Sequence, residues 1–288
     1  MEGRVSRWQW AVLIGILIFP FSAYGQQRPL RTDDAEILDA GRVRTEIGVE
    51  FLQDQSYSLS GLTGDLMRLG VASIHVGVGE YAEFQLSGIA QDFLSVTSRT
   101  EAVIPPTFTG DSTNDFGNIV LGTKLKFFEE KGRRPAMAFK FAVELPNAKP
   151  DSGLGTSETQ FYSSLLFKKR VGRAQFLADL GFAILGSPVE AGRQTDPLTY
   201  GFGAIVAVHR SLNLVAEING RHGPSGRVGN ENQSQVRAGV QFSTGKIRWD
   251  LAGVAGLKDF DPKSGIVVGI TYEFQAFNRK APPITIKK

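Results

Sequence analysis

The stretch from Thr159 to Ile184, TQFYSSLLFKKRVGRAQFLADLGFAI, constrains the fold more than any other part of the chain. Alternate residues share a face in a β-strand, and here two alternating runs flank a short basic turn, Lys169 to Arg173. In the second run, Phe176 and Phe182 face one way while Asp179 faces the other. The pattern predicts a hairpin with one apolar face.

The same alternation recurs along most of the chain, in about twelve segments whose typical length of about 9 to 11 residues suits a tilted crossing of a bilayer. The register of the second segment stays open, because apolar residues lie on both of its faces around Leu69 and Ile74. We expect strands at residues 41–51, 67–78, 81–93, 115–128, 136–145, 159–168, 174–184, 198–208, 212–219, 233–242, 247–255 and 265–274.

The connections between these segments are expected to alternate, long after the odd-numbered strands and short after the even-numbered ones. An even-stranded outer-membrane barrel predicts both features, since its turns are short on the periplasmic side and its external loops are longer. The predicted fold is an all-β, antiparallel, up-and-down transmembrane β-barrel with both termini in the periplasm. A secreted soluble β-sandwich is the alternative, but nothing in that fold requires the alternation.

The two ends of the chain differ from the barrel region in composition. Residues 1–25 predict a signal peptide, with a basic start, an apolar run too short to span a bilayer as a helix and a small-residue cleavage site at Ala23-Tyr24-Gly25. A membrane anchor is the other interpretation. We expect residues 26–40 to form a polar periplasmic lead-in, residues 41–274 the barrel, and residues 275–288 a polar tail.

Composition excludes several functional classes. The chain has no cysteine, so it forms neither disulfides nor thiolate metal sites, and its three histidines lie far apart in sequence. The formal charge is +3, with basic and acidic residues interleaved, which argues against a nucleic-acid partner. We expect no metal, no cofactor and no enzymatic activity; a barrel hydrolase that uses His222 and Ser225 is the catalytic alternative.

The charged face of the predicted strands must look into the barrel, because a lysine or arginine that faces lipid near the midplane costs about 2 to 4 kcal/mol. The face contains both signs of charge, so no strong ion selectivity follows. The predicted lumen-lining residues are Arg42, Arg44, Glu46, Glu50, Glu83, Lys124, Lys126, Lys140, Glu144, Asp179, Glu217, Arg237, Arg248, Asp250 and Glu273.

The longest predicted connection, Leu94 to Asn114, carries an apolar cluster that includes Val103, Ile104 and Phe108. Long loops without secondary structure often have a function. We therefore expect these three residues to form a constriction or an apolar entrance in the lumen. A mobile external loop is the alternative.

Several motifs resemble one known family: TDDAEILDAGRVRTEIGVEF at the first strand, VGVGEYAEFQLSG, DFGNIVLGTKLKFF, AMAFKFAVELP and GLGTSETQF. Together they are similar to the bacterial outer-membrane proteins of the MetA-pathway of phenol degradation family. The resemblance implies an outer-membrane channel or uptake protein, with aromatic compounds as the suggested cargo. The chain departs from the usual aromatic end of such barrels, because a polar tail follows Phe274.

The sequence thus predicts an outer-membrane channel that lets small solutes, including aromatic or hydrophobic ones, pass passively. The alternative is a barrel without transport that serves the envelope structurally or binds a partner through its external loops. The expected partners are the lipid bilayer of the outer membrane, a small-molecule solute and the machinery that inserts barrels.

Overall fold

The computed structural model describes residues 28–223 and 228–277. These residues form fourteen strands and one short 3-10 helix. The elements are β1 (Arg42–Tyr57), β2 (Leu62–Gly77), β3 (Ala82–Arg99), β4 (Ser112–Asp115), β5 (Ile119–Phe128), β6 (Ala136–Leu145), η1 (Pro150–Ser152), β7 (Gln160–Val171), β8 (Ala174–Gly186), β9 (Gln194–Thr195), β10 (Leu198–His209), β11 (Leu212–His222), β12 (Gln233–Thr244), β13 (Ile247–Gly256) and β14 (Ser264–Gln275).

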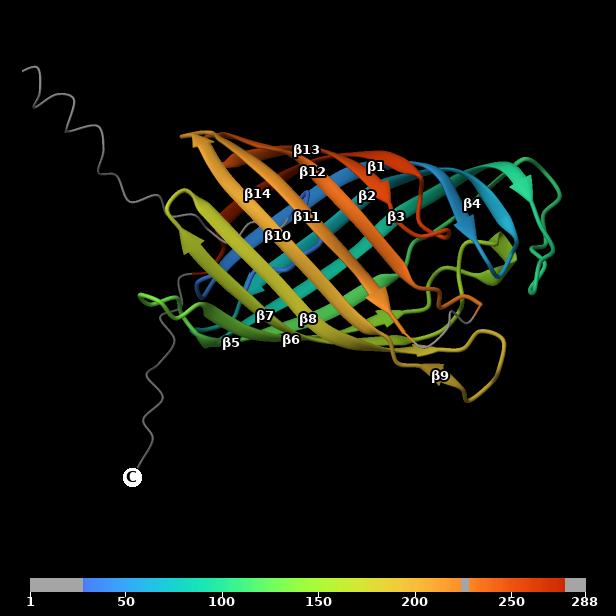
Figure 1. The fold of residues 1–288 in the computed structure, drawn as a ribbon, viewed down its shortest axis with the longest axis horizontal. Helices are drawn as coiled ribbons and strands as arrows, with labels where there is room; N and C mark the ends of the chain where they lie inside the picture. Colours follow the sequence, from blue (N-terminus) through green and yellow to red (C-terminus); the bar gives the residue numbers. More distant parts are fainter. Residues whose placement is uncertain (1–27, 224–227, 278–288) are drawn as a thin grey trace, which may run out of the picture.

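Twelve long strands close into one antiparallel barrel. Neighbours in sequence pair with each other, β14 pairs with β1, and β8 pairs with β10, while the short β4 and β9 pair with β3 and β8. In Figure 1 the barrel lies on its side, with the short turns at the left and the longer connections at the right. The predicted twelve-stranded, all-β antiparallel barrel is confirmed.

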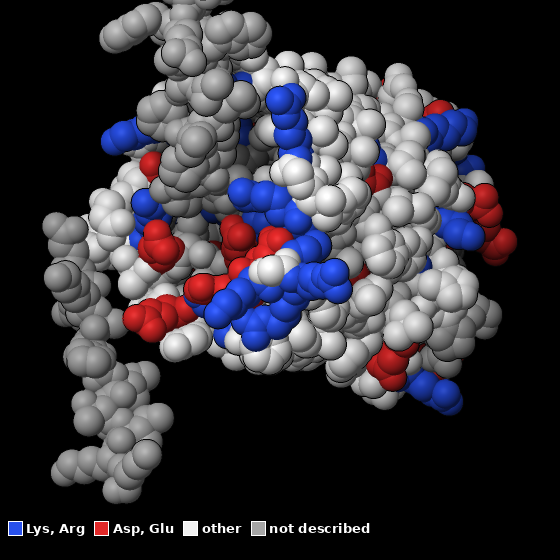
Figure 2. Space-filling view, turned by 60° about the vertical axis from the view of Figure 1, so that its left-hand side comes forward, with Lys and Arg blue, Asp and Glu red and all other residues white. Residues whose placement is uncertain are grey.

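The outer face of the barrel is apolar and the inner face is charged, as the side-chain alternation requires. On β13, Leu251 points outward and is half exposed, whereas its neighbour Asp250 is buried inside. Figure 2 shows a flank that is mostly free of charged side chains, which gather instead at the short-turn end. Exposed aromatic side chains, among them Tyr81, Phe127 and Tyr272, lie beside the short turns. Such a belt is typical of barrels that sit in a bilayer.

No helix among the described residues is long and apolar enough to cross a membrane.

The first three strands are longer than predicted, and the connection after the first strand is short where a long one is expected. β1 and β2 continue through the polar residues 52–66 and are joined by residues 58–61 alone. The pairing of β1 with β2 continues through this region with a register shift between Leu52 and Gln55, where Asp54 has a φ of 50°. Beyond the shift, the hydroxyls of Ser56 and Thr63 form a hydrogen bond of 2.9 Å between the two strands. A polar composition was therefore a poor guide to where this hairpin ends.

A β-bulge at Gly70 explains the second strand, whose register was unclear in the sequence. Gly48 of β1 pairs with Val71 and Val49 pairs with Leu69, so Gly70 has no partner on β1, and its φ is 62°. A bulge of one residue reverses the side-chain alternation. Leu69 before it and Ile74 after it, five positions apart, therefore both face outward.

Candidate functional site in the barrel interior

Residues 28–40 lie inside the barrel, which corrects the expected periplasmic lead-in. Three of their apolar side chains are almost completely buried, with exposed fractions of 4% for Leu30, 0% for Ala35 and 3% for Leu38. We call residues 28–40 the internal segment. It runs from the middle of the lumen to the short-turn end, where Arg42 begins β1.

Side chains of the wall satisfy the backbone of the internal segment. The carboxylate of Glu217 accepts hydrogen bonds from the backbone N–H groups of Arg31 and Thr32, both at 2.8 Å. Glu83 accepts one from the N–H of Leu38 at 2.8 Å. Unpaired buried amides are costly, so these carboxylates fix the path of the segment across the lumen.

Ion pairs hold the same segment against three further strands. Lys140 of β6 pairs with Asp33. Lys168 of β7 pairs with Asp34 at 2.9 Å and with Glu36 at 2.8 Å. At the other end of the segment, Arg28 Nε lies 3.4 Å from Asp250 Oδ1. The acidic run that looked like a solvated lead-in is thus the counter-charge of lumenal lysines.

Apolar side chains of the inner wall receive the segment as well. Leu30 packs in a buried cluster with residues of β8, β10 and β11, and Ala35 packs in another with residues of β6 and β7. The wall residues of these clusters are Leu177, Ile205, Val215, Ala136, Ala138 and Leu166. Apolar side chains that point into a predominantly charged lumen indicate an apolar partner there, and the internal segment supplies it.

Glycines of the wall allow the segment to approach closely. A Cβ atom on Gly48 would overlap the guanidinium of Arg28, and one on Gly77 would overlap the backbone oxygen of Asp39. Both glycines lie on strands at positions where the segment touches the wall. The barrel is therefore shaped for this segment from the middle of the lumen to the short-turn end.

A chamber of about 720 Å³ occupies the rest of the lumen, next to the internal segment. On one side Glu50 is surrounded by three guanidinium groups, those of Arg31 at 3.6 Å, Arg68 at 3.4 Å and Arg237 at 3.4 Å. The side chain of Arg31 is 41% exposed toward this space. This side of the chamber binds polar or charged groups most readily.

Apolar side chains also line the chamber, namely Val71, Ile89, Val120 and Leu154. They lie among polar side chains of the same strands, such as Ser73, His75, Gln85 and Asp92. The chamber wall thus mixes charged, polar and apolar groups, which suits a small solute that carries both polar and apolar surface.

The predicted lumen-lining residues fall into three groups in the structure. Five line the chamber: Glu46, Glu50, Lys140, Glu144 and Arg237. Six contact or lie beside the internal segment: Glu83, Lys124, Asp179, Glu217, Arg248 and Asp250. Four lie near the short turns in ion pairs of their own: Arg42, Arg44 and Glu273 with one another, and Lys126 with Glu129.

Val103, Ile104 and Phe108 do not line the chamber. The backbone N–H groups of Val103 and Ile104 donate to the oxygen of Leu59 at 2.9 Å, and the ring of Phe108 lies 4.9 Å from the guanidinium carbon of Arg99. Because β3 continues to Arg99, the connection that follows it begins beyond the chamber, at the far end of this long strand. The segment that fills the lumen is the internal segment, not the expected loop.

Sequence reasoning missed Arg31, Arg68 and Asp92 in the chamber wall. The bulge at Gly70 hid Arg68, because it reverses the face on which the residue lies. Arg31 belongs to a stretch without any periodicity. The available signal was the set of apolar residues, such as Leu166, on a face that is otherwise charged.

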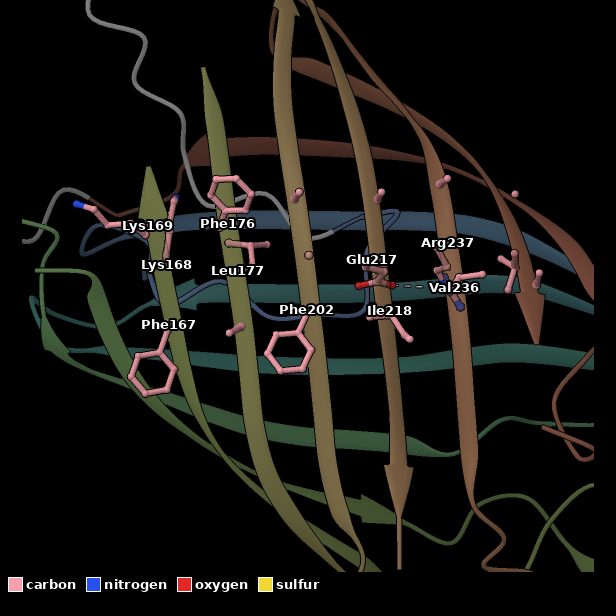
Figure 3. A pocket seen from close by; sticks show the side chains of 18 of the residues that line it. Phe167, Lys168, Lys169, Phe176, Leu177, Phe202, Glu217, Ile218, Val236 and Arg237 are labelled. Atoms are coloured by element: carbon pink, nitrogen blue, oxygen red, sulfur yellow. Dashed lines mark ion pairs between the residues drawn. The ribbon is translucent and has the colours of Figure 1, made fainter. Parts of the chain in front are cut away.

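The outer wall carries a separate groove of about 970 Å³ across β7, β8 and β10 to β13. Figure 3 shows Phe167, Phe176 and Phe202 beside it, and the ion pair between Glu217 of β11 and Arg237 of β12. The wall here is a single layer of paired strands. It separates an apolar outer surface from charges inside.

The catalytic alternative gains no support from the described residues. His222 is exposed at the end of β11, and Ser225 lies outside the described residues, as do residues 1–25 of the predicted signal peptide and residues 278–288 of the predicted tail. In the parts of the chain that the structure describes, no group of three or more His, Asp or Glu side chains is placed to hold a metal ion.

Three solved structures illustrate how known barrels compare with this chain. The NanC porin matches with a TM-score of 0.49 and 6% identity, over 80% of this chain and 98% of that one. The outer-membrane channel DcaP of Acinetobacter baumannii matches with 0.40 and 12%, over 81% and 96%. The translocator domain of the autotransporter NalP from Neisseria meningitidis matches with 0.46 and 12%, over 81% and 88%. Likeness at this level carries no statement about function.

No family model matches the chain, and no curated protein matches it. The resemblance to the MetA-pathway of phenol degradation family is therefore not confirmed and stays a prediction from the sequence motifs.

Proposed function

We propose that this protein is an outer-membrane channel for small solutes whose lumen is closed at rest by its own internal segment, residues 28–40. The observation that carries the proposal is the chamber of about 720 Å³ that ends at this segment. A barrel of twelve strands encloses more space than a barrel of eight, whose interior is filled by side chains. It encloses less space than a barrel of sixteen or so strands, which leaves a wide aqueous channel. The apolar outer belt and the absence of strand edges in a closed barrel support the membrane location.

In the proposed orientation the short turns lie in the periplasm and the longer connections outside. The chamber then opens toward the outside, and the internal segment closes the periplasmic side. Solute binds next to Arg31 and Glu50, and passage requires the segment to leave its ion pairs with Lys140 and Lys168. Mainly electrostatic contacts suit a reversible closure, because water and ions replace them when the segment moves.

The second candidate is a barrel without transport, in a structural or partner-binding role. The observation in its favour is the number of contacts that fix the internal segment, which include hydrogen bonds, ion pairs and two apolar clusters. A segment that never moves makes the barrel a closed scaffold, and its function then resides in the external connections.

Single-channel conductance in a planar bilayer distinguishes the two. We compare the mature protein with the double substitution Asp33→Lys and Asp34→Lys, which places new positive charges against Lys140, Lys168 and Lys124. The channel proposal expects rare openings in the unaltered protein and frequent, larger openings in the variant. Deletion of residues 103–110, which lie outside the chamber, is the control and leaves the conductance unchanged.

A second variant keeps the test decisive if the first variant misfolds. Deletion of residues 28–40 removes the internal segment without adding charge to the lumen. If both variants insert, keep the heat-resistant gel mobility of a folded barrel and remain silent, the channel proposal is wrong.

A further inference from the structure

The barrel wall is interrupted at one place, between β3 and the two strands that face it. β3 pairs with β5 as far as Ser87 and Val120, and pairing resumes with β4 at Asp92 and Asp115. Residues 116–118 between them are not part of a strand, and one backbone hydrogen bond, from the N–H of Gly117 to the oxygen of Ile89 at 3.0 Å, bridges the interval.

Side chains fix this interruption in a defined shape. Asn118 donates to Glu144 at 2.6 Å and accepts from the N–H of Ala148 at 2.9 Å. Asn147 accepts from the N–H of Ile119 at 3.1 Å. The next strand, β6, has already ended at Leu145, so these amides replace strand pairing at this height. The interruption is therefore a built part of the wall rather than a frayed end.

An outer groove of about 500 Å³ lies over the interruption. Six residues line both this groove and the inner chamber: Ala72, Ser73, Ser87, Gly88, Ile89 and Gly117. The larger groove across β7 to β13 offers a comparison within the same molecule, because it shares only Arg237 with the chamber. The chamber and the outer groove thus share wall residues where strand pairing is missing.

Of the six residues that line both the groove and the chamber, five are small and the sixth is Ile89. An ideal Cβ atom on Gly117 would lie 2.5 Å from the Cβ of Ile89, so the side chain of Ile89 sits directly against the glycine. Ile89 is thus the partition between chamber and groove. The outer rim of the groove is apolar and includes Phe116, which is 65% exposed, whereas on the chamber side Val120 lies with the polar residues Ser87 and Asn118.

We propose that this interruption is a lateral opening through which a small, uncharged, mainly apolar solute passes between the chamber and the lipid. The lining excludes ions, because charged groups would have to cross an apolar rim. The bilayer is a favourable destination for such a solute, since the transfer of apolar surface from water into hydrocarbon is favourable. The inference rests on the proposed function in that the solute first enters the chamber from the loop end.

The test measures entry of an uncharged apolar dye, N-phenyl-1-naphthylamine, into the outer membrane of Gram-negative cells that produce the full chain. The dye fluoresces only in hydrocarbon. Ile89→Trp fills the partition, Ile89→Gly removes it, and Ile218→Trp is the matched control, because Ile218 lines the larger outer groove and not the chamber. Gel mobility checks the folding of every variant.

We expect the dye to enter faster with the unaltered chain than in cells without it. Ile89→Trp loses this gain, Ile89→Gly increases it, and Ile218→Trp retains it. Equal rates for Ile89→Trp and Ile218→Trp overturn the lateral opening. The conductance of the Asp33→Lys, Asp34→Lys variant separates the two proposals. If this variant conducts ions but the chain gives no gain in dye entry, only the lateral route is refuted. If dye entry increases and depends on Ile89 but the variant does not conduct ions, only the axial channel is refuted.

Discussion

At the scale of single residues, carboxylates of the wall act as backbone acceptors for the internal segment. Glu217 holds two consecutive N–H groups of the segment, and it also accepts from Asn219 at 2.9 Å and lies 3.8 Å from Arg237 Nε. An isolated buried carboxylate is costly, but one with four partners is stabilised. Glu217 therefore both shapes the segment and neutralises part of the charge of Arg237.

We expect Glu217→Ala to loosen the internal segment. The change leaves the amides of Arg31 and Thr32 without acceptors, at about 1 to 3 kcal/mol each, and each unpaired amide corresponds to about a 5- to 150-fold larger population of the locally open segment. Hydrogen–deuterium exchange of the backbone amides of residues 28–36, with the protein in lipid nanodiscs, measures this local opening. Glu129→Ala, which removes the same charge from an exposed turn, is the control. Unchanged exchange in Glu217→Ala would show that other contacts alone fix the segment.

At the scale of elements, strand β2 shows why one residue decides the orientation of a whole strand. Gly70 adopts a left-handed conformation and is left out of the pairing with β1, so the outward positions change from odd to even. Arg68 on one side of the bulge and His75 on the other both reach the lumen in consequence. Without the bulge, one half of β2 would present these polar side chains to lipid.

We expect Gly70→Val to destabilise the barrel. A β-branched residue in a left-handed conformation costs about 1 to 2 kcal/mol, and the added Cβ would lie 2.8 Å from the Cβ of Ala90. The urea midpoint of the refolded protein in detergent should fall. Gly88→Val is the control, because the nearest atom to its ideal Cβ is 3.5 Å away. If the two variants lose the same stability, the conformation at position 70 is not the cause.

At the scale of the whole molecule, the barrel could be predicted from sequence and its interior could not. Side-chain alternation is a local property, so twelve strands were found and β6 was placed at its observed bounds. The internal segment has no periodicity, and its partners lie far away in sequence: Ala35 packs on Leu166, and Asp34 pairs with Lys168. Such contacts depend on how the barrel closes, which no local pattern encodes.

The membrane location yields a last prediction, because the cost of a charge depends on its depth in the bilayer. Leu251 lies in the middle of β13 and Leu257 lies just beyond its end, and their exposed fractions are similar, 50% and 53%. Leu251→Arg should lower the free energy of unfolding in phospholipid vesicles by about 2 to 4 kcal/mol, and Leu257→Arg by about 0 to 1 kcal/mol. Guanidinium unfolding followed by tryptophan fluorescence measures both. In a soluble barrel the two positions face the same water, so equal losses would exclude the bilayer as the surrounding solvent of this belt.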